Sequence, residues 1–486
     1  MSGIDTLKPA EIWKYFNEIL QIPRPSKNEE KIIAYLQDFG IKHNLETITD
    51  KAGNMLIRKP ATKGMENRMS VVLQSHVDMV CEKNSDIEHD FSNDPIKAYV
   101  DKGWVKAKGT TLGADDGIGI AAQLAILAST SIKHGPIECL FTVDEETGLT
   151  GAFEMEPNFF NSKILLNLDS EDEGELFIGC AGGVDTSITF AYDTEKIPSE
   201  SKSFNLSITG LKGGHSGDEI DKGLGNSIKI INRFLWKGTR KYDLRIASLE
   251  GGNLRNAIPR EAFATFVIHK DEVKSMLQLF DEYKKDVANE FGGIEPNIKI
   301  ELNECEMPQR VIDEPTQYDL LNALYGCPHG VISMSHQIPG LVETSTNLAA
   351  IKFIQDNQIL ITTSQRSSID SAKQDIANMV ESVFRLANAS VVHSGGYPGW
   401  KPNRDSEILS ITEGSYKKLF GEEPVVRAIH AGLECGLFLE KYPGLDMISF
   451  GPTIKGAHSP DERLDIETTD KFWKLLLDVL EKIPQA

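Results

Sequence analysis

Four short apolar runs, rich in β-branched and aromatic residues, constrain the fold of this chain most. They are SVVLQS, IECLFTV, KILLNL and DMISF, at residues 70–75, 137–143, 163–168 and 446–450. Near-continuous hydrophobicity over such lengths is typical of strands buried on both faces of a sheet. An apolar, helix-length segment between the first two runs suits a crossover between parallel strands. The sequence therefore predicts an α/β fold, with a mixed, mostly parallel sheet and helices on both of its faces.

Two helices are predicted before the first of these strands. Residues 10–20 place apolar side chains on one helical face. Residues 26–29 form a capping box, Ser-Lys-Asn-Glu, ahead of a second apolar run. Gly40 is the predicted end of this second helix, because glycine often follows the last helical residue.

The pattern changes after residue 183. Strand-like and helical segments alternate there in an α+β pattern that needs a sheet of its own. The segment includes a predicted hairpin with its turn at Asp356–Asn357 and a helix over residues 371–386, before a stretch rich in Gly and Pro. We therefore expect a discontinuous catalytic domain, residues 1–183 and 396–486, and an inserted domain, residues 184–395.

Charge and cysteine content argue against several classes of protein. The chain carries 51 Lys and Arg against 72 Asp and Glu, a net charge of −21, which disfavours binding to nucleic acid or anionic membranes. No apolar stretch approaches the roughly 20 residues that span a bilayer. Asp5, Lys8 and Glu11 do not fit a signal peptide, so we expect a cytoplasmic protein. The 6 cysteines include no C-x-x-C pair, which argues against a zinc ribbon.

Metal-binding or acidic side chains follow every one of the predicted buried strands. They are His76 and Asp78, the acidic residues 144–146, Asp169, and His458 in a loop, while Asp115–Asp116 precedes the crossover helix. Ligands of open α/β sheets bind beyond the carboxyl ends of the strands, so these side chains are expected to converge. Each has an ordinary explanation alone, as a loop pair, a helix cap or solvated charge. Together they predict a site for two ions about 3.5–4 Å apart, with one bridging carboxylate and another as base.

Several longer motifs carry a resemblance to a known family. They are SHVD (75–78), TLGADDGIGIA (111–121), FTVDEETGLTGA (141–152), LNLDSEDEGELFIGCAGG (166–183), GLKGGHSG (210–217), GGNLRNAIP (251–259) and GAHSPDERLDI (456–466). These motifs resemble the M20 metallopeptidases, and within them the aminoacyl-histidine dipeptidase type, which cleaves Xaa-His dipeptides. The resemblance covers nearly the whole chain in the same order.

The resemblance implies a centre with two divalent metal ions, Zn²⁺ in first place and Mn²⁺ or Co²⁺ as alternatives. The implied ligands are His76 and Asp169 for one ion, Glu146 and His458 for the other, and Asp115 as the bridge. Glu145 matches the general base, and Asp78 matches an acid that accepts the other ring N–H of His76. The sequence leaves open the order of the two neighbouring acids, both for Glu145 and Glu146 and for Asp115 and Asp116.

The inserted domain resembles a lid and dimerisation domain. By resemblance, His215 would stabilise the tetrahedral oxyanion, Asn256 and Arg366 would hold the substrate's C-terminal carboxylate, and Gly432 would offer a backbone contact. Ordinary alternatives are a loop histidine, a structural ion pair and a turn glycine. The resemblance also implies a homodimer through this domain.

The implied function is metal-dependent hydrolysis of dipeptides, preferentially Xaa-His, by a water activated by two metals with Glu145 as base. The partner is the dipeptide substrate, with no nucleic acid and no membrane. A broader dipeptidase or an N-acyl-amino-acid amidohydrolase would use the same metals and base. The rival from another class is a non-catalytic metal-binding protein, which the presence of a separate base disfavours.

Overall fold

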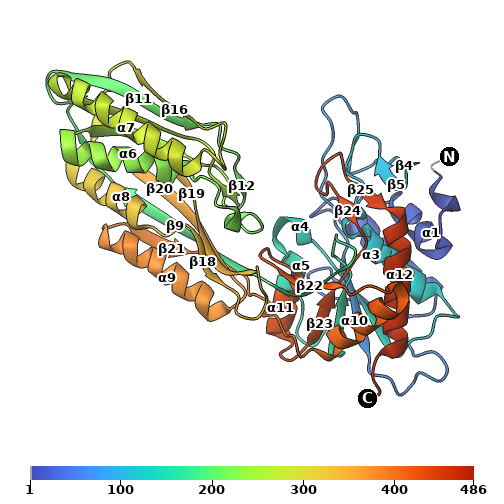
Figure 1. Ribbon diagram of the computed structural model, residues 1–486. Coiled ribbons are helices and arrows are strands. Elements are labelled where there is room, and N and C mark those ends of the chain that lie inside the picture. Colours follow the sequence, from blue (N-terminus) through green and yellow to red (C-terminus); the bar gives the residue numbers. More distant parts are fainter. Residues whose placement is uncertain (1–2) are drawn as a thin grey trace. The chain divides into compact units, whose positions relative to one another are not determined.

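The computed structural model describes residues 3–486, and the chain divides into two compact units (Figure 1). The first unit comprises the chain up to Gly179, Pro402–Ala428 and Leu433–Ala486, and the second comprises Cys180–Lys401 and Ile429–Gly432. Residues 1–2, which the expected first domain includes, lie outside the described residues.

The junction segments differ from the expected boundaries. Residues 180–183, 396–401 and 429–432 group with the second unit rather than with the first. Backbone hydrogen bonds explain this grouping, since Cys180 N–H donates to Trp400 C=O and Ala181 N–H donates to Ile429 C=O. The short return segment is therefore tied to the start of the second unit's own strands.

The first unit is built on an eight-stranded mixed sheet, counted over residues 3–486, with the order β1-β2-β6-β3-β7-β23-β8-β22. Its strands are β1 Glu46–Thr49, β2 Met55–Lys59, β3 Val71–His76, β6 Ile137–Thr142, β7 Ile164–Asn167, β8 Glu175–Cys180, β22 Val425–Ile429 and β23 Asp446–Ser449. Pairing is parallel between β6, β3, β7 and β23, whereas β1 and β2 pair antiparallel, β2 pairs antiparallel with β6, and β8 pairs antiparallel with β23. The α/β class with a mixed sheet is confirmed, and its parallel part is the centre formed by the four predicted strands.

Helices accompany this sheet. Those of the first unit are α1 Ala10–Ile19, α2 Glu30–Lys42, α3 Ala114–Ala128, α4 Glu145–Gly148, α5 Thr150–Glu154, α10 Glu407–Phe420, α11 Glu434–Lys441 and α12 Ile466–Lys482. The predicted crossover is α3, which connects the parallel strands β3 and β6 and packs against α1 and β3. A smaller sheet has the order β24-β25-β5-β4, from Ile454–Lys455, Arg463–Asp465, Trp104–Ala107 and Ala98–Asp101.

The predicted end of the second helix is wrong. Gly40 lies inside α2, which continues to Lys42. A Cβ atom at Gly40 would stand 1.9 Å from Thr47 Oγ1, so the glycine lets β1 approach the helix. The capping box also differs, because Glu29 accepts from Lys27 N–H at 2.9 Å rather than from the N–H of Ser26.

The second unit contains an antiparallel sheet with the order β16-β11-β15-β13-β19-β20-β9-β21, with β18 also paired to β19. Its strands are β9 Gly182–Ala191, β11 Ser201–Thr209, β13 Arg245–Gly251, β15 Ala262–His269, β16 Lys299–Glu304, β18 Gly330–Met334, β19 Val342–Ile354, β20 Gln358–Ser367 and β21 Ser390–His393. Two short pairs join Thr194–Glu195 (β10) to Val311–Ile312 (β17) and Gly214–His215 (β12) to Ala257–Ile258 (β14).

Helices cover one face of this second sheet. They are α6 Ser227–Tyr242, α7 Val273–Phe291, α8 Glu314–Gly326 and α9 Asp370–Leu386, and they lie alongside one another in Figure 1. Along β15, buried Phe266 belongs to the core shared with these helices, whereas Phe263 points to the exposed side. The predicted hairpin turn at Asp356–Asn357 and the helix after it are confirmed.

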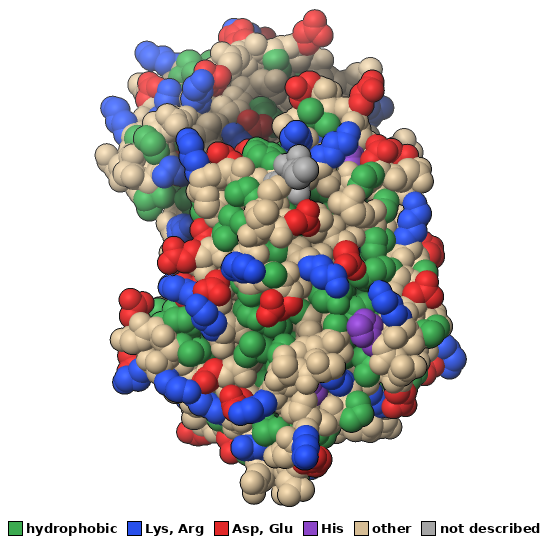
Figure 2. All heavy atoms as spheres, turned by 90° about the vertical axis from the view of Figure 1, so that its right-hand side faces the viewer, with side chains coloured by type: hydrophobic (Ala, Val, Ile, Leu, Met, Phe, Trp, Pro, Cys, Tyr) green, Lys and Arg blue, Asp and Glu red, His purple; other side chains and the backbone are tan. Residues whose placement is uncertain are grey.

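Two further features are the apolar character of the helices and the distribution of charge on the surface. Among residues 3–486, no helix combines the length and the apolar character needed to cross a membrane. Figure 2 shows one face of the molecule, on which acidic and basic side chains are interspersed with apolar ones. The negative net charge therefore does not gather into a single acidic area on that face.

Candidate metal centre

The parallel strands of the first unit bring their polar ends together. β3 ends at His76, while Asp144 to Glu146 follow β6 and Asp169 follows β7. β3 pairs in parallel with both β6 and β7, so these three ends meet at one edge of the sheet. Asp115 joins them from the first turn of α3, and His458 from the loop between β24 and β25.

Two groups of side chains form at this edge, and they share Asp115. One is His76, Asp115 and Asp169, and the other is Asp115, Glu146 and His458; within each group the candidate ligand atoms lie within 4.8 Å of one another. His76 Nε2 lies 3.0 Å from Asp115 Oδ1 and 3.3 Å from Asp169 Oδ1. His458 Nε2 lies 3.2 Å from Asp115 Oδ2 and 3.0 Å from Glu146 Oε2. Each carboxylate oxygen of Asp115 therefore faces a different group.

The electrostatics of these groups favour a cation. Hydrogen bonds with Asp115 and Glu146 raise the pKa of His458 to about 11. Burial, together with the charge of Asp115, raises the pKa of Asp169 to about 7, although His76 opposes this shift. Glu146 Oε1 is buried and has no hydrogen-bond partner among the described residues. A mixed set of imidazole and carboxylate ligands with an unfilled buried oxygen fits a divalent transition metal ion.

Asp116 has a different environment from its neighbour. Its side chain is buried, and Asp116 Oδ1 accepts the N–H of Gly119 at 3.1 Å. A Cβ atom at Gly119 would stand 2.4 Å from that oxygen, so the glycine makes room for the carboxylate. Asp116 thus turns into its own helix, whereas Asp115 faces the two histidines.

Glu145 and Glu146 also differ in their surroundings. Glu146 faces His458, while Glu145 groups with His76 and Glu146. Burial raises the pKa of Glu145 well above its ordinary value, with further contributions from nearby Asp169 and Glu146. Glu145 is half-buried, and a carboxyl group with a raised pKa is a candidate for proton transfer.

Asp78 contacts both His76 and the start of α4. Asp78 Oδ1 lies 3.3 Å from His76 Nδ1 and accepts Glu145 N–H at 3.0 Å. Asp78 Oδ2 accepts Glu146 N–H at 3.2 Å and the Ser26 hydroxyl at 2.8 Å. Burial alone would raise the pKa of Asp78, but His76 and these donors lower it to about 2. The carboxylate therefore fixes the backbone of both neighbouring glutamates and lies beside the ring of His76.

The remaining predicted site residues lie in the second unit. His215 Nδ1 accepts the N–H groups of Gly217 and Asp218, at 3.3 and 3.2 Å, which leaves Nε2 of the neutral ring as a donor. Burial and the charge of Arg366 lower the pKa of His215. Asn256 is exposed and, with His215, lines a cavity of about 780 Å³.

Arg366 and Gly432 meet at Tyr397, which sequence reasoning missed. Arg366 Nη1 donates to Tyr397 Oη at 3.2 Å, while its buried Nε has no partner among the described residues. A Cβ atom at Gly432 would lie 2.8 Å from the Tyr397 ring, and one at Gly183 would lie 2.7 Å from it. The ring therefore packs directly against both glycine backbones, and its hydroxyl orients the guanidinium. The only signal in the sequence is the Gly/Pro-rich stretch that contains Tyr397.

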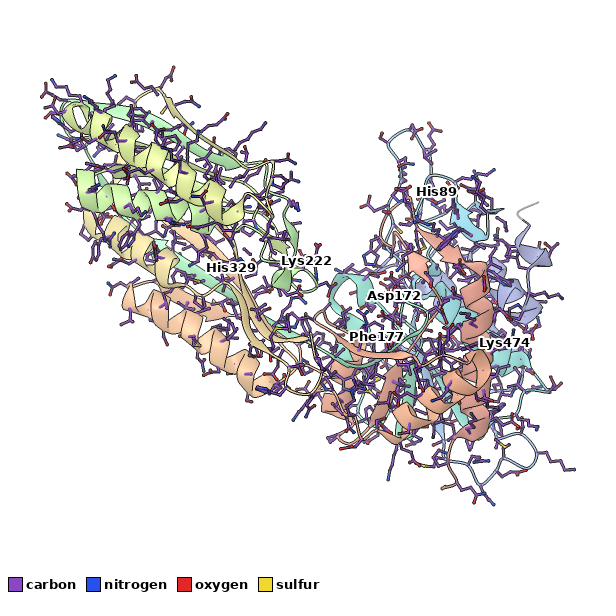
Figure 3. All side chains as sticks on the ribbon, viewed as in Figure 1. His89, Asp172, Phe177, Lys222, His329 and Lys474 are labelled. Atoms are coloured by element: carbon purple, nitrogen blue, oxygen red, sulfur yellow. The ribbon has the colours of Figure 1, made fainter. Side chains whose placement is uncertain are left out.

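Sequence reasoning also missed two acids around the first unit's site, buried Glu434 and half-buried Glu171. Glu434 accepts Gln74 Nε2 at 2.6 Å and Thr142 Oγ1 at 2.8 Å, and burial raises its pKa to about 8. Burial and the charge of Asp115 likewise raise the pKa of Glu171 to about 8. Its neighbour Asp172, labelled in Figure 3, pairs with Lys455 at 2.5 Å. Adjacent acids in one run thus have different environments, which sequence alone does not separate.

Known proteins match this chain in sequence and in fold. Residues 72–482 match the model of peptidase family M20/M25/M40. The chain therefore belongs to this family and is a hydrolase of the peptidase class, which confirms the resemblance. It is 44% identical over 484 residues to the cytosol non-specific dipeptidase of Escherichia coli strain K12, with 100% of both chains covered.

Solved structures agree with this assignment. The aminoacylhistidine dipeptidase from Vibrio alginolyticus is 47% identical, with a TM-score of 0.93 and 100% of both chains covered. The aminopeptidase PepT from Bacillus cereus is 16% identical, with a TM-score of 0.57, and covers 98% of this chain and 99% of its own. At that identity the second comparison supports the fold alone.

Proposed function

We propose that this protein is a two-metal dipeptidase that hydrolyses dipeptides and prefers Xaa-His. The observation that carries the proposal is the pair of ligand groups that share Asp115, because a shared carboxylate can bridge two adjacent ions. The names of two full-length relatives, a non-specific dipeptidase and an aminoacylhistidine dipeptidase, support the substrate class.

In this proposal each group holds one divalent ion, with Zn²⁺ first and Mn²⁺ or Co²⁺ as alternatives. His76 and Asp169 would hold the first ion, Glu146 and His458 would hold the second, and Asp115 would bridge them. Bound ions of this kind polarise a carbonyl group and lower the pKa of a water molecule. Glu145 accepts the proton of the attacking water and delivers it to the leaving amine. Asp78 fixes the ring orientation of His76.

The second unit supplies the proposed substrate contacts. His215 Nε2 donates to the oxyanion that forms during hydrolysis, as its acceptor role at Nδ1 allows. Arg366, whose buried Nε is unfilled, binds the C-terminal carboxylate of the dipeptide together with Asn256. Gly432 contributes a backbone contact. We further propose a homodimer through this unit and a cytoplasmic location.

Hydrolysis assays on the purified protein with added Zn²⁺ or Mn²⁺ test the proposal. Xaa-His dipeptides should be cleaved, and Glu145→Gln should lower kcat by about 10²–10⁴-fold, the usual contribution of a general base. Glu154→Gln, an exposed acid on the nearby helix α5, is the matched control and should keep full activity. Unchanged turnover in Glu145→Gln would overturn the mechanism.

A broader dipeptidase is the second candidate, favoured by the name of the Escherichia coli relative. Parallel rates on Xaa-His, other dipeptides and N-acyl amino acids separate the candidates. Equal rates on all dipeptides would favour the broader activity, and faster cleavage of N-acyl amino acids would favour an amidohydrolase. Bound metal without hydrolysis of any of them would contradict a catalytic role.

A further inference from the structure

The turn that leads into α3 is held on one side by a buried carboxylate. Glu462, which is 2% exposed, accepts four backbone N–H groups. The donors are Leu112 and Gly113 to Oε2, at 2.6 and 2.9 Å, and Ala114 and Asp115 to Oε1, at 2.7 and 3.4 Å. A negative charge at a helix N-terminus is favourable, so this carboxylate fixes the backbone from which the Asp115 side chain extends.

A buried guanidinium holds the same turn from its carbonyl side. Arg24 is also 2% exposed, and its Nη2 donates to Gly113 C=O. Its Nη1 donates to the carbonyl groups of Val77 and Asp78, at 2.9 and 2.6 Å. Gly113 therefore donates its backbone N–H to one charged side chain and accepts at its C=O from another.

Two glycines of the TLGADDGIGIA motif make room for Arg24. Gly113 has a φ of +71°, and a Cβ atom there would lie 2.7 Å from Arg24 Nη2. A Cβ atom at Gly117 would lie 2.7 Å from the same nitrogen. The absence of side chains at these two positions therefore lets the guanidinium group approach the backbone of the turn.

These contacts connect the segments that carry the proposed metal ligands. Arg24 binds the carbonyl groups that directly follow His76, and Glu462 lies four residues after His458 in the chain. Both residues converge on the turn that carries Asp115. We infer that Arg24 and Glu462 are positioning residues, which hold Asp115 between His76 and His458 so that its two oxygens face different ions. This inference rests on the proposed metal site.

A merely structural role makes a different prediction. If Glu462 only capped a helix, its loss would lower stability and leave the affinity for metal ions unchanged. Glu138 provides the matched comparison, because it is also a buried carboxylate that accepts two backbone N–H groups, from Asn161 and Ser162 at 2.9 Å each. It lies near the start of β6, whereas the metal ligands follow the end of that strand.

The test measures Zn²⁺ binding to metal-free protein by calorimetry, together with the absorption spectrum of the Co²⁺-loaded protein. Glu462→Gln replaces one acceptor oxygen by a donor, so two of the four N–H groups would face an NH₂ group. We expect Zn²⁺ affinity to fall by about 10–100-fold, the range for residues that support metal ligands, and the Co²⁺ spectrum to change. Glu138→Gln should lose thermal stability and keep the wild-type affinity and spectrum.

Arg24→Lys is the second variant, because a single ammonium group keeps the charge but cannot reproduce the planar fork of the guanidinium. It should also weaken Zn²⁺ binding by about 10–100-fold. If Glu462→Gln does not fold, Arg24→Lys and Glu462→Asp are measured in its place. Affinities and spectra equal to those of Glu138→Gln in these variants would overturn the inference. Failure of the wild-type protein to bind Zn²⁺ would instead overturn the proposed metal site itself.

Discussion

Asp78 anchors the backbone of Glu145 and Glu146, and it also contacts His76. Replacing it with Asn separates these two roles, since the side chain keeps its shape and loses one acceptor. Asp78 Oδ1 accepts Glu145 N–H and lies 3.3 Å from His76 Nδ1, while Oδ2 accepts Glu146 N–H and the Ser26 hydroxyl. If the new NH₂ group takes the Oδ1 position, it faces two nitrogen atoms. If it takes the Oδ2 position, the Ser26 hydroxyl can accept from it and only Glu146 N–H loses its acceptor.

The second orientation is therefore favoured, and it determines the expected loss in the free energy of unfolding. One buried N–H group without an acceptor destabilises a fold by about 1–3 kcal/mol, and we expect that loss in the free energy of unfolding of the metal-free protein. Metal affinity should fall by about 10–100-fold, because His76 would no longer contact a carboxylate. Urea unfolding and calorimetric Zn²⁺ titration measure the two effects independently.

Asp446→Asn is the control for this substitution. Asp446 also accepts a serine hydroxyl and a backbone N–H, from Ser406 at 2.6 Å and Ile408 at 3.0 Å, but it begins β23 and so lies at the opposite end of the sheet. It should lose stability and keep the wild-type affinity for Zn²⁺. If Asp78→Asn loses stability but binds Zn²⁺ like the wild type, Asp78 anchors the backbone only and the reasoning about His76 is refuted.

Three other perturbations test different parts of the molecule. Tyr397→Phe removes only the hydroxyl that accepts from Arg366, so KM for dipeptides should rise about 2–10-fold with kcat nearly unchanged in steady-state assays; an unchanged KM would contradict the orienting role. Burial and the charge of Arg366 lower the pKa of His430 to about 3. Between about pH 6.5 and 3 the unfolded chain therefore binds a proton there that the folded chain does not, and the stability due to neutral His430 is lost as pH falls. Between pH 6.5 and pH 5 the free energy of unfolding should fall by about 2 kcal/mol more in the wild type than in His430→Gln. Equal falls in the two proteins would refute this. Finally, a chelator should lower Tm and excess Zn²⁺ should restore it, because ions that bind only the folded state stabilise it; equal melting curves would count against the metal site.

The sequence predicted the centre of the first sheet because buried parallel strands have a strong compositional signal. Each central strand is nearly continuous in apolar residues, so its end is visible, and the polar residue after that end is visible too. His76, Glu146 and Asp169 could be expected to converge for this reason alone. The flanking strands β1 and β2 are short and partly exposed, and their antiparallel pairing left no comparable signal.

The supporting residues could not be predicted in the same way. The groups that these residues contact are distant in the chain, and no local sequence pattern predicts them. The residues are Arg24, Tyr397 and Glu462. Glu462 stands in the motif GAHSPDERLDI, which does not indicate the groups that its carboxylate accepts from. Only the fold reveals that four N–H groups surround it.

The kinds of partner that surround each acid distinguish the carboxylates that accept backbone N–H groups from the proposed metal ligands. Glu462 and Asp78 accept backbone N–H groups, so their negative charge is already stabilised by donors of the chain. Asp115 and Glu146 instead face the imidazole nitrogens of His76 and His458, and Glu146 Oε1 has no partner among the described residues. Imidazole nitrogens and carboxylate oxygens can all act as metal ligands, and a cation between them would bind lone pairs that the chain's own donors leave unfilled. The net charge of the chain is therefore a poor guide to its function, whereas the supply of donors around each acid is a direct one.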